Sequence, residues 1–324
     1  MKRVITVSRY TDVPAFYGSW FMNRLADGFA GWEPPDGGPR RWISLRREDV
    51  LAFVFWSRNY RFFLRHLLKL RELGYPCLFH CSVTVLPPDM DRGTIAPEHA
   101  VDIMKQMAAW FSPGQLSWRY EPILVTDRTP PHYHVQAFER LASALRGHVT
   151  RAQIRFLVRN ADNEIHCLRF EHEIRTRLIK LSADKRLELA RCLGQIASRN
   201  GMTLQTCCDP TLVSSRLQPG CCLDRDLLAR IGGDPEWKGE PANRQSGCGC
   251  VASVDIGRPG TCPHGCFHCL DNLNKPQAAL AYRAHDATSA FLGLGKAESD
   301  QTFAEVRAAS GDPSPGSDPS PASS

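Results

Sequence analysis

The sequence predicts an α/β fold, because short apolar runs alternate with longer helical patterns over its first two-thirds. The runs typical of buried strands cover residues 3–8, 49–57, 77–84, 115–125, 152–158 and 202–208. The helical patterns between them cover residues 16–29, 58–71, 98–111, 133–147 and a long stretch that ends with 186–201. Strands that alternate with helices in this way predict a parallel sheet with helices outside it.

The choice between two parallel architectures depends on a motif that is missing. Six such units fit either an open doubly wound sheet or a partial (β/α) barrel. No Gly-x-Gly-x-x-Gly follows any of the predicted strands, which argues against the dinucleotide-binding version of the open sheet. We therefore predict a partial (β/α)6 TIM-like barrel over residues 1–206, with a cysteine-rich segment over 207–275 that completes the barrel mouth.

The C-terminal extension over residues 276–324 has a different composition. Its last part is rich in Pro, Ser and Gly and lacks apolar anchors. Such a segment cannot bury enough surface to offset the entropy lost on ordering. We expect disorder from about residue 296 onward.

Charge and hydropathy narrow the class of protein. The net charge is +6, and the basic side chains of Arg61, Arg65 and Lys69 recur every four residues, as on the solvated face of a helix. No apolar run approaches the roughly 18 residues that a membrane span needs. The N-terminal stretch turns polar by Ser8, too early for a signal peptide. We expect a cytoplasmic protein with no membrane contact.

Polar side chains follow the predicted strands at the points where the strands end. They include three arginines, three carboxylates and two amides: Arg9, Arg58, Arg119, Asp12, Glu121, Asp209, Asn59 and Gln205. In a barrel these ends converge on one mouth, where chemistry is done. The alternative is that polar loops only cap helices, as Asp12 could before Val13 and Pro14. Arginine does not cap a helix N-terminus, so we favour a site at the mouth.

The 13 cysteines fall into two groups. Cys77, Cys81, Cys167 and Cys192 lie inside apolar segments, where a cysteine is a small buried hydrophobe. The others lie between Cys207 and Cys269. In a reducing compartment such a cluster indicates metal ligands rather than disulfides.

The stretch TCPHGCFHC, residues 261–269, holds three of these thiols in a Cys-x3-Cys-x2-Cys pattern. A closed zinc site or an electron-carrying [4Fe–4S] cluster takes four ligands, whereas three thiolates leave one iron open. A short loop that wraps around a cluster can need a residue with positive φ, and Gly265 permits one.

This pattern resembles that of the radical S-adenosylmethionine (SAM) superfamily, in which partial (β/α)6 barrels are typical. The resemblance implies a [4Fe–4S] cluster on Cys262, Cys266 and Cys269, with SAM bound at the open iron and cleaved to a 5′-deoxyadenosyl radical. It also implies a reductant such as flavodoxin or ferredoxin. The residue before the third cysteine lies near the adenine in that superfamily, and here it is His268.

A longer series of motifs extends the resemblance. SRYTDVPAFYGSWFMNRL, VFWSRN, WRYEPIL, LQTCCD, GCCLD, CGCVASVDIG and TCPHGCFHC occur in this order. Together they resemble the bacterial family called domain of unknown function 1848, over about residues 3–272. This family implies the fold and the cluster, but no reaction.

The resemblance also implies a second site. The family is expected to carry thiols at the positions of Cys207, Cys222, Cys248 and Cys250, enough for a closed iron–sulfur cluster or a zinc ion. Cys208 and Cys221 would then be extras. In the alternative, Cys248, Cys250, Cys266 and Cys269 form one zinc ribbon.

Two functions from different classes remain open. In the first, the chain is a radical SAM-like enzyme that acts on an unknown small-molecule or nucleotide-like substrate. Arg9, Arg58 and Arg119 would bind an anionic group of SAM or of this substrate. Asp12, Glu121 and Asp209 would orient hydroxyls or move protons, and Asn59, Gln205 and His268 would contact the cofactor. In the second, the chain is a metal-stapled binding protein, for example for nucleic acid, without turnover.

Overall fold

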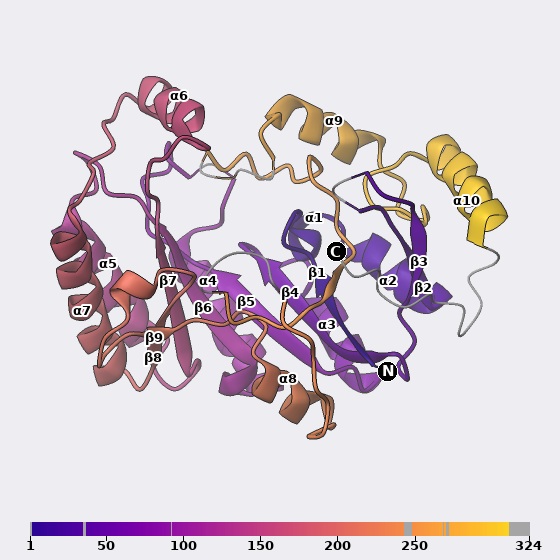
Figure 1. The fold of residues 1–324 in the computed structure, drawn as a ribbon, viewed down its shortest axis with the longest axis horizontal. Coiled ribbons are helices and arrows are strands. Elements are labelled where there is room, and N and C mark those ends of the chain that lie inside the picture. The colour runs from indigo at the N-terminus through magenta and orange to yellow at the C-terminus, as the bar shows by residue number, and fades with distance from the viewer. Residues whose placement is uncertain are drawn as a thin grey trace.

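The computed structural model describes residues 2–34, 37–91, 93–242, 248–267, 269 and 272–310. One sheet of eight strands has the order β10–β1–β4–β5–β6–β7–β8–β9, and its strand pairs are parallel (Figure 1). The strands are β1 (Arg3–Val7), β4 (Val50–Ser57), β5 (Cys77–Ser82), β6 (Leu116–Ile123), β7 (Arg151–Phe156), β8 (Thr203–Thr206), β9 (Gln218–Pro219) and β10 (Val254–Asp255). A separate antiparallel pair joins β2 (Phe29–Trp32) and β3 (Arg41–Ser44).

The helices lie mainly between the strands of the large sheet. They are α1 (Val13–Phe16), α2 (Gly18–Asp27), α3 (Leu64–Glu72), α4 (Pro97–Trp110), α5 (Pro131–Ala144), α6 (Glu164–Ile174), α7 (Ala183–Arg199), α8 (Arg225–Gly232), α9 (Lys275–Ala284) and α10 (Lys296–Ser310). The α/β class and the parallel sheet predicted from the sequence are confirmed. The six predicted strands correspond to β1 and β4 to β8.

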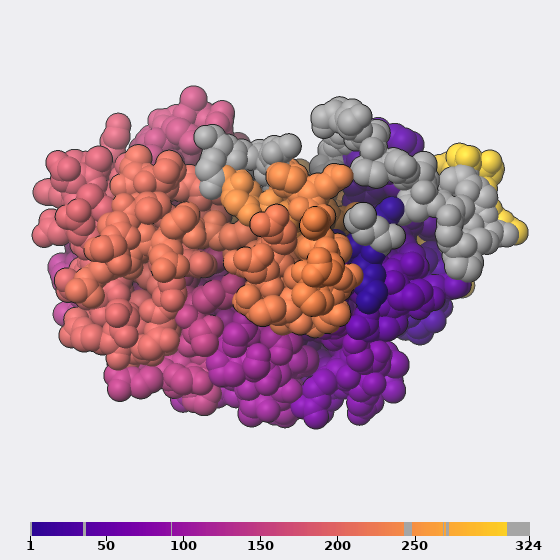
Figure 2. All heavy atoms as spheres, turned by 60° about the horizontal axis from the view of Figure 1, so that its bottom comes forward, coloured from indigo at the N-terminus to yellow at the C-terminus, as the bar shows by residue number. Residues whose placement is uncertain are grey.

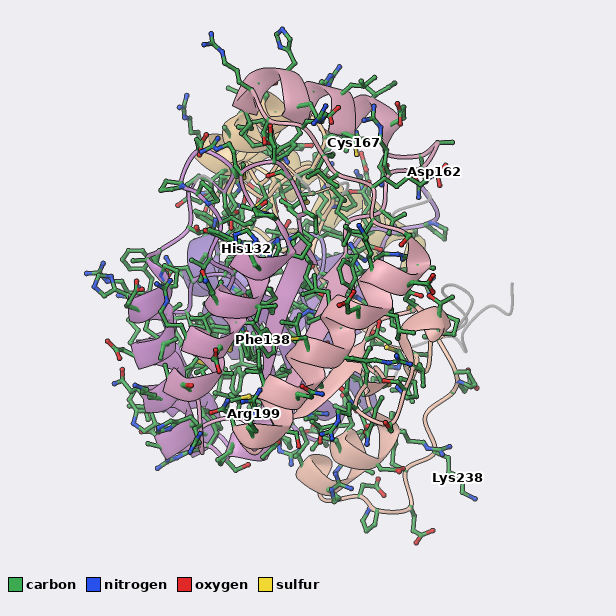
Figure 3. The ribbon with its side chains drawn as sticks, turned by 90° about the vertical axis from the view of Figure 1, so that its left-hand side faces the viewer. His132, Phe138, Asp162, Cys167, Arg199 and Lys238 are labelled. Carbon is green, nitrogen blue, oxygen red and sulfur yellow. The ribbon has the colours of Figure 1, made fainter. Side chains whose placement is uncertain are left out.

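The central strand β4 is apolar from Val50 to Trp56 because both faces of the sheet are covered there. On one face, Phe21 of α2 packs edge-on against Phe53 and Phe55 of β4, with ring centroids 5.2 and 5.5 Å apart. Farther along the sheet, Phe138 of α5 stacks on Trp118 of β6 at 4.5 Å (Figure 3). The basic side chains of α3 point to solvent, as predicted.

The opposite face is covered by residues that follow β8. Leu227 and Leu228 of α8 pack in one buried cluster with Leu51 and Val54 of β4. In Figure 1 this segment crosses in front of the strands, and in Figure 2 it spreads over them as a continuous orange layer. In a closed barrel, side chains of the strands alone fill the interior. Here α8 occupies that space, and within the described residues no strand pair closes the sheet between β9 and β10.

The contact between α8 and β4 leaves no room for a side chain at Gly232. A Cβ there would lie 2.6 Å from Leu51 Cδ1 and 3.2 Å from Leu51 O. We expect Gly232→Ala to lower the free energy of unfolding by about 1 to 3 kcal/mol, because a well-packed core resists added volume. Gly114→Ala is the control, since its nearest neighbour would be Ser112 Oγ at 3.9 Å. Equal stabilities of the two variants in urea unfolding would contradict this packing.

The extension over 276–324 corrects one prediction. We expected disorder from about residue 296, but α10 occupies 296–310, where Val306 is buried and Phe303 is partly buried in a cluster that includes Phe29 of β2 and Trp42 of β3. Trp42 of β3 contacts Phe303 with ring centroids 4.9 Å apart. The prediction was wrong because Phe303 and Val306 do serve as apolar anchors, and because the β2–β3 pair contributes to the surface that receives them. Residues 311–324 lie outside the described part of the chain. Among the described residues, no helix has the length and apolar composition that crossing a membrane requires.

Candidate functional site

The three-cysteine loop reaches the carboxyl ends of the strands through β10. This strand pairs in parallel with β1, so that Ile5 lies opposite Val254 and Thr6 opposite Asp255. Parallel strands end at the same edge of a sheet, so the loop after β10 begins beside the segment after β1. Through this added edge strand, the cysteine loop, which comes after β9 in the chain, returns to the side of β1.

Asp255 fastens the two segments together. Its carboxylate accepts hydrogen bonds from the Ser8 hydroxyl at 2.5 Å and from the backbone N–H groups of Arg9 and Gly257, both at 2.9 Å. A Cβ at Gly257 would lie 1.9 Å from Ser8 Oγ, so only glycine allows this close approach. The start of the cysteine loop is therefore fixed against the end of β1.

The loop itself is held by hydroxyl contacts with the first helical segment. The Tyr17 hydroxyl donates to the carbonyl of Thr261 at 2.7 Å, and the side chains of Thr11 and Thr261 share a short hydrogen bond. Gly265 has a φ of 72°, which confirms that the wrap uses a positive φ at this glycine.

Asn272 closes the loop from its other end. Its side-chain oxygen accepts from the backbone N–H of Cys262 at 2.9 Å, and its amide donates to the carbonyl of Tyr10 at 2.8 Å. The same amide lies 3.8 Å from Cys269 Sγ. One side chain thus positions the first and third cysteines relative to the end of β1.

A cavity of about 400 Å³ opens where the loop meets the strand ends, and we call it the mouth cavity. This volume lies in the range of small-molecule sites. The predicted residues that line it are Arg9, Asp12, Arg58, Glu121, Cys262, Cys266 and Cys269. The structure therefore brings together, at one edge of the sheet, cysteines and polar residues that are far apart in the sequence.

Asp12 connects three parts of the mouth cavity. One carboxylate oxygen accepts from Ala15 N at 3.0 Å and caps α1. The other accepts from the backbone N–H of Arg58 at 2.8 Å and lies 2.7 Å from Nε2 of His264. The capping role considered from the sequence is real, and the same side chain also lines the cavity. The other ring nitrogen of His264 lies 3.2 Å from the Gly93 carbonyl.

Arg58 is a cation beside the cysteine loop, and 12% of its side-chain surface is exposed. Its guanidinium pairs with Asp91 and donates to the Thr84 hydroxyl at 3.3 Å. Burial lowers the pKa of Arg58, but the charge of Asp91 and the nearby Cys266 and Asp12 outweigh it, so the pKa is raised. The guanidinium therefore stays charged.

Two of the loop thiols, Cys262 and Cys266, have raised pKa values, which favour the protonated form at neutral pH. Burial raises the pKa of Cys262 to about 12, with Asp12 adding to the shift. Burial also raises the pKa of Cys266 to about 11, although Arg58 opposes it. Metal binding here would release protons, because metal ligands bind as thiolates.

The remaining walls of the mouth cavity carry charge of both signs. Arg9 lies over the Trp56 ring at 5.6 Å from its centroid and also approaches Asp255 at 3.5 Å. Glu121 Oε2 is buried and has no hydrogen-bond partner among the described residues. Arg155, which the sequence argument did not select, is exposed and lines the same cavity.

The predicted position of Arg119 is wrong. We expected it to join Arg9 and Arg58 beside the three-cysteine loop, but it does not line the mouth cavity. Its guanidinium pairs with Glu121 and donates to Cys222 Sγ at 3.0 Å. The reason is the period of a strand: Arg119 shares its face of β6 with Glu121, and this face is covered by the segment that contains Cys222.

Cys222 is the centre of a second group of thiols. It packs in one cluster with Cys207, Cys221 and Cys250. The neighbouring thiols Cys207 and Cys250, together with Arg119, hold the pKa of Cys222 well below its usual value despite burial. Cys221 and Cys222, together with burial, raise the pKa of Cys250. Cys248, the remaining predicted ligand, is half-buried against the same cluster.

Four other predicted residues do not line the mouth cavity or cannot be placed. Asn59 Oδ1 accepts from the backbone N–H of Arg61 at 3.0 Å in a local turn. Gln205 Oε1 lies 3.3 Å from the amide of Gln153, near the second thiol group. Asp209 caps the short helix at Pro210–Leu212 and pairs with Arg186 at 3.2 Å, so the capping alternative applies to it. His268 lies outside the described residues.

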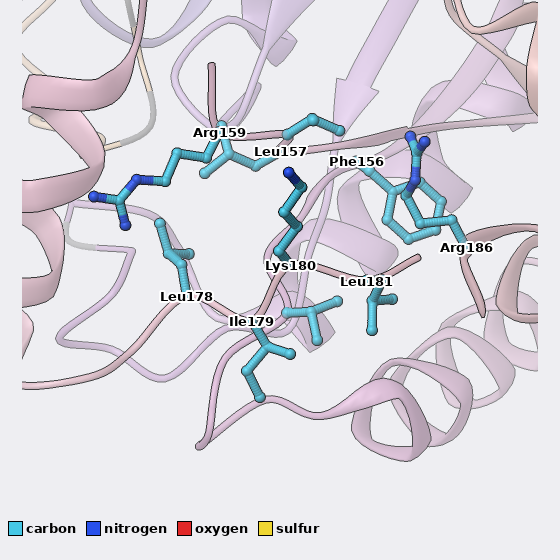
Figure 4. Close-up of a pocket in the computed structure, with 10 residues that line it drawn as sticks. Phe156, Leu157, Arg159, Leu178, Ile179, Lys180, Leu181 and Arg186 are labelled. Carbon is cyan, nitrogen blue, oxygen red and sulfur yellow. The ribbon is translucent and has the colours of Figure 1, made fainter. Parts of the chain in front are cut away.

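A second cavity lies beyond the end of β7 (Figure 4). It measures about 100 Å³, which is too small for most substrates. Its arginines are already paired, Arg159 with Glu164 and Arg186 with Asp209. The mouth cavity is therefore the better candidate for a functional site.

Comparison with known protein families matches residues 4–270 to the domain of unknown function DUF1848. The match covers most of the chain and every residue of the mouth cavity except Asn272. The chain belongs to the DUF1848 family. No curated protein matches it. Membership in DUF1848 agrees with the order of the sequence motifs described above. It does not identify a reaction.

The donor chemistry of this DUF1848 chain fits an iron–sulfur cluster, although the thiols are not gathered in advance. Within the described residues, no group of three or more His, Cys, Asp or Glu side chains is arranged to hold a metal ion. Cys262, Cys266 and Cys269 nevertheless line one cavity, and thiolates are the usual ligands of iron–sulfur clusters. Cys77 and Cys81 lie instead in the apolar core, as predicted for cysteines without a metal role.

Proposed function

We propose that this DUF1848 protein is a radical SAM-like iron–sulfur enzyme whose [4Fe–4S] cluster is held by Cys262, Cys266 and Cys269. The observation that carries the proposal is that these three thiols line the same cavity as Arg9 and Arg58. Three protein ligands leave one iron of such a cluster open, and that iron would supply the binding place for the amino and carboxylate groups of SAM.

The sheet supports the proposal through its strand order. From β1 to β8, neighbouring strands of the large sheet follow one another along the chain once the β2–β3 pair is set aside. This is the order of a partial (β/α)6 barrel, whose active site lies at the carboxyl ends of the strands. We infer that the sheet is such a partial barrel, held open by α8 and extended by β10.

The charges around the mouth cavity support an anionic substrate. Arg9 and Arg155 line the cavity and would bind a carboxylate or phosphate group of SAM or of a small-molecule or nucleotide-like substrate. Arg58 already pairs with Asp91, so its part would be to favour the thiolate form of the neighbouring Cys266. Glu121 would accept a hydrogen bond from a substrate hydroxyl or hold a proton through its buried Oε2.

The contacts that hold the cysteine loop over the strand ends would help to exclude water from the reaction. Cys266 and His264 are buried, and Asn272 and Thr261 hold the loop over the strand ends. Exclusion of water strengthens the electrostatic interactions inside a site and prevents side reactions. A reductant such as flavodoxin or ferredoxin would supply the electron to the cluster.

Anaerobic reconstitution with iron and sulfide tests the proposal. We expect brown protein whose reduced electron paramagnetic resonance spectrum changes when SAM is added, because SAM binds at the open iron. Colourless protein with stoichiometric zinc and no iron would refute the proposal and would favour a metal-stapled binding protein. An iron-containing protein whose spectrum ignores SAM would show that the cluster is closed.

A further inference from the structure

A further cavity lies between α6 and the start of α9, and we call it the outer groove. It measures about 550 Å³, against about 400 Å³ for the mouth cavity, and the two cavities share no lining residue. Its walls come from α6, from Phe267 of the cysteine loop and from residues 273–276. Helices α6 and α9 both lie at the top of the molecule in Figure 1. The outer groove therefore has no part in the site described above.

The cysteine loop contributes to both cavities. Cys266 and Cys269 line the mouth cavity, whereas Phe267, which stands between them in the sequence, lines the outer groove. Phe267 also contacts Phe170 of α6, with ring centroids 6.0 Å apart. A cluster held by the loop cysteines would therefore be separated from the outer groove by little more than the loop itself.

Exposed apolar side chains surround the outer groove. Leu273, which lines it, is 51% exposed. On α6, Ile165 and Leu168 are 64% and 50% exposed, and helical spacing places Ile165 beside Arg169, another lining residue. Exposed apolar side chains with a polar rim are typical of a surface that meets another protein.

The rim of the outer groove is mainly positive. Arg169 of α6 and Lys275 of α9 line it, and neither belongs to an ion pair among the described residues, whereas Glu173 is acidic. Residues 155–180, which include α6, hold six Arg or Lys and four Asp or Glu. Two of those four acids pair with one arginine, Arg159. The surface is therefore complementary to an acidic partner.

The mixture of side chains favours a protein partner over nucleic acid. Protein–DNA interfaces are much more positively charged than interfaces between proteins. The outer groove instead includes Glu173 and the exposed Leu273. Electron-transfer complexes are weak and bury little surface, which suits a small patch of a few apolar side chains and unpaired charges.

We propose that the outer groove and the adjoining exposed face of α6 form the docking surface for the protein that reduces the cluster. This partner presents acidic side chains to Arg169 and Lys275. One electron leaves the reduced partner and enters the cluster through the loop, and no bond is made or broken at the docking surface. The inference rests on the proposed function, because a reductant needs a cluster to reduce, and it assigns the surface and the charge that select this reductant.

Anaerobic titration of the reconstituted full chain with an acidic flavodoxin measures the docking directly. We expect Arg169→Glu to weaken binding by about 10-fold at low ionic strength, because like charges across an interface repel. Glu173→Gln should strengthen binding, since it removes the opposing charge from the same groove. Added salt should reduce both differences, as expected for exposed charges.

Arg65→Glu is the matched control. Arg65 is also an exposed arginine on a helix, but it lies on α3 and does not line the outer groove. Its substitution changes the net charge equally and should leave the affinity within about 2-fold. Equal affinities of Arg169→Glu and Arg65→Glu, or no binding by the unsubstituted chain, would overturn the proposal. So would binding of a single-stranded oligonucleotide, lost in Arg169→Glu, without binding of flavodoxin.

SAM cleavage separates a failure of the docking surface from a failure of the proposed function. The release of 5′-deoxyadenosine is measured with subsaturating reduced flavodoxin and with dithionite, a small reductant that needs no docking surface. We expect Arg169→Glu to lower the ratio of the flavodoxin-driven rate to the dithionite-driven rate by about 10-fold, and Arg65→Glu to leave it unchanged. No cleavage with either reductant would refute the proposed function, and the titration would still decide the docking surface. Cleavage with an unchanged ratio in Arg169→Glu would overturn the docking surface alone.

Discussion

Replacing Cys266 with Ala is expected to abolish SAM cleavage by the reconstituted protein, with a loss of at least about 1,000-fold, because the members of a catalytic unit act together. Cys266 is 7% exposed and lies between the other two thiols of the loop in sequence. Without it, only two thiolates would remain at the mouth cavity, too few to hold the proposed cluster. The measurement is the release of 5′-deoxyadenosine under anaerobic reducing conditions, together with the iron content.

Cys81→Ala is the matched control for this experiment. Cys81 is also buried, at 2% exposure, but it lies in the apolar core at the end of β5. Its loss should reduce stability and leave iron content and SAM cleavage per folded molecule unchanged. Equal activity of Cys266→Ala and the unsubstituted protein would show that the loop holds no catalytic cluster.

The strands of the large sheet could be predicted because local patterns specify them. The run Val50–Ser57 is apolar up to Trp56, as expected of a strand buried on both faces, and the structure places it as β4 inside the sheet. The convergence of Arg9, Asp12 and Arg58 followed from the parallel arrangement alone.

Other parts of the site depend on contacts between distant segments, and the sequence contains no local signal for them. β10 is only two residues long, and its pairing with β1 is what delivers the cysteine loop. The position of Arg119 depends on which face of β6 is covered by the segment that contains Cys222. Asp91 and Asn272 were missed because single polar residues in loops are common, and Asp255 was missed because β10 was not expected. Asp255 could have been found, since it lies in one of the motifs that indicate the family.

Asp12 joins the helical, strand and loop parts of the mouth cavity, and this makes it the most sensitive side chain there. It is 7% exposed and accepts hydrogen bonds from Ala15 N and Arg58 N while facing His264 Nε2 at 2.7 Å. Its removal would leave buried donors without acceptors. Each such group costs about 1 to 3 kcal/mol.

We therefore expect Asp12→Ala to lower the free energy of unfolding by about 3 to 5 kcal/mol and to loosen the cysteine loop. Denaturant unfolding measures the first effect, and the rate of proteolysis around residues 257–267 measures the second. Asp209→Ala is the matched control, because Asp209 also caps a short helix before a proline but is partly exposed. Its loss should cost only about 1 kcal/mol, with no change at the loop. If the two variants lose equal stability, Asp12 serves only as a helix cap and does not hold the loop to the strand ends.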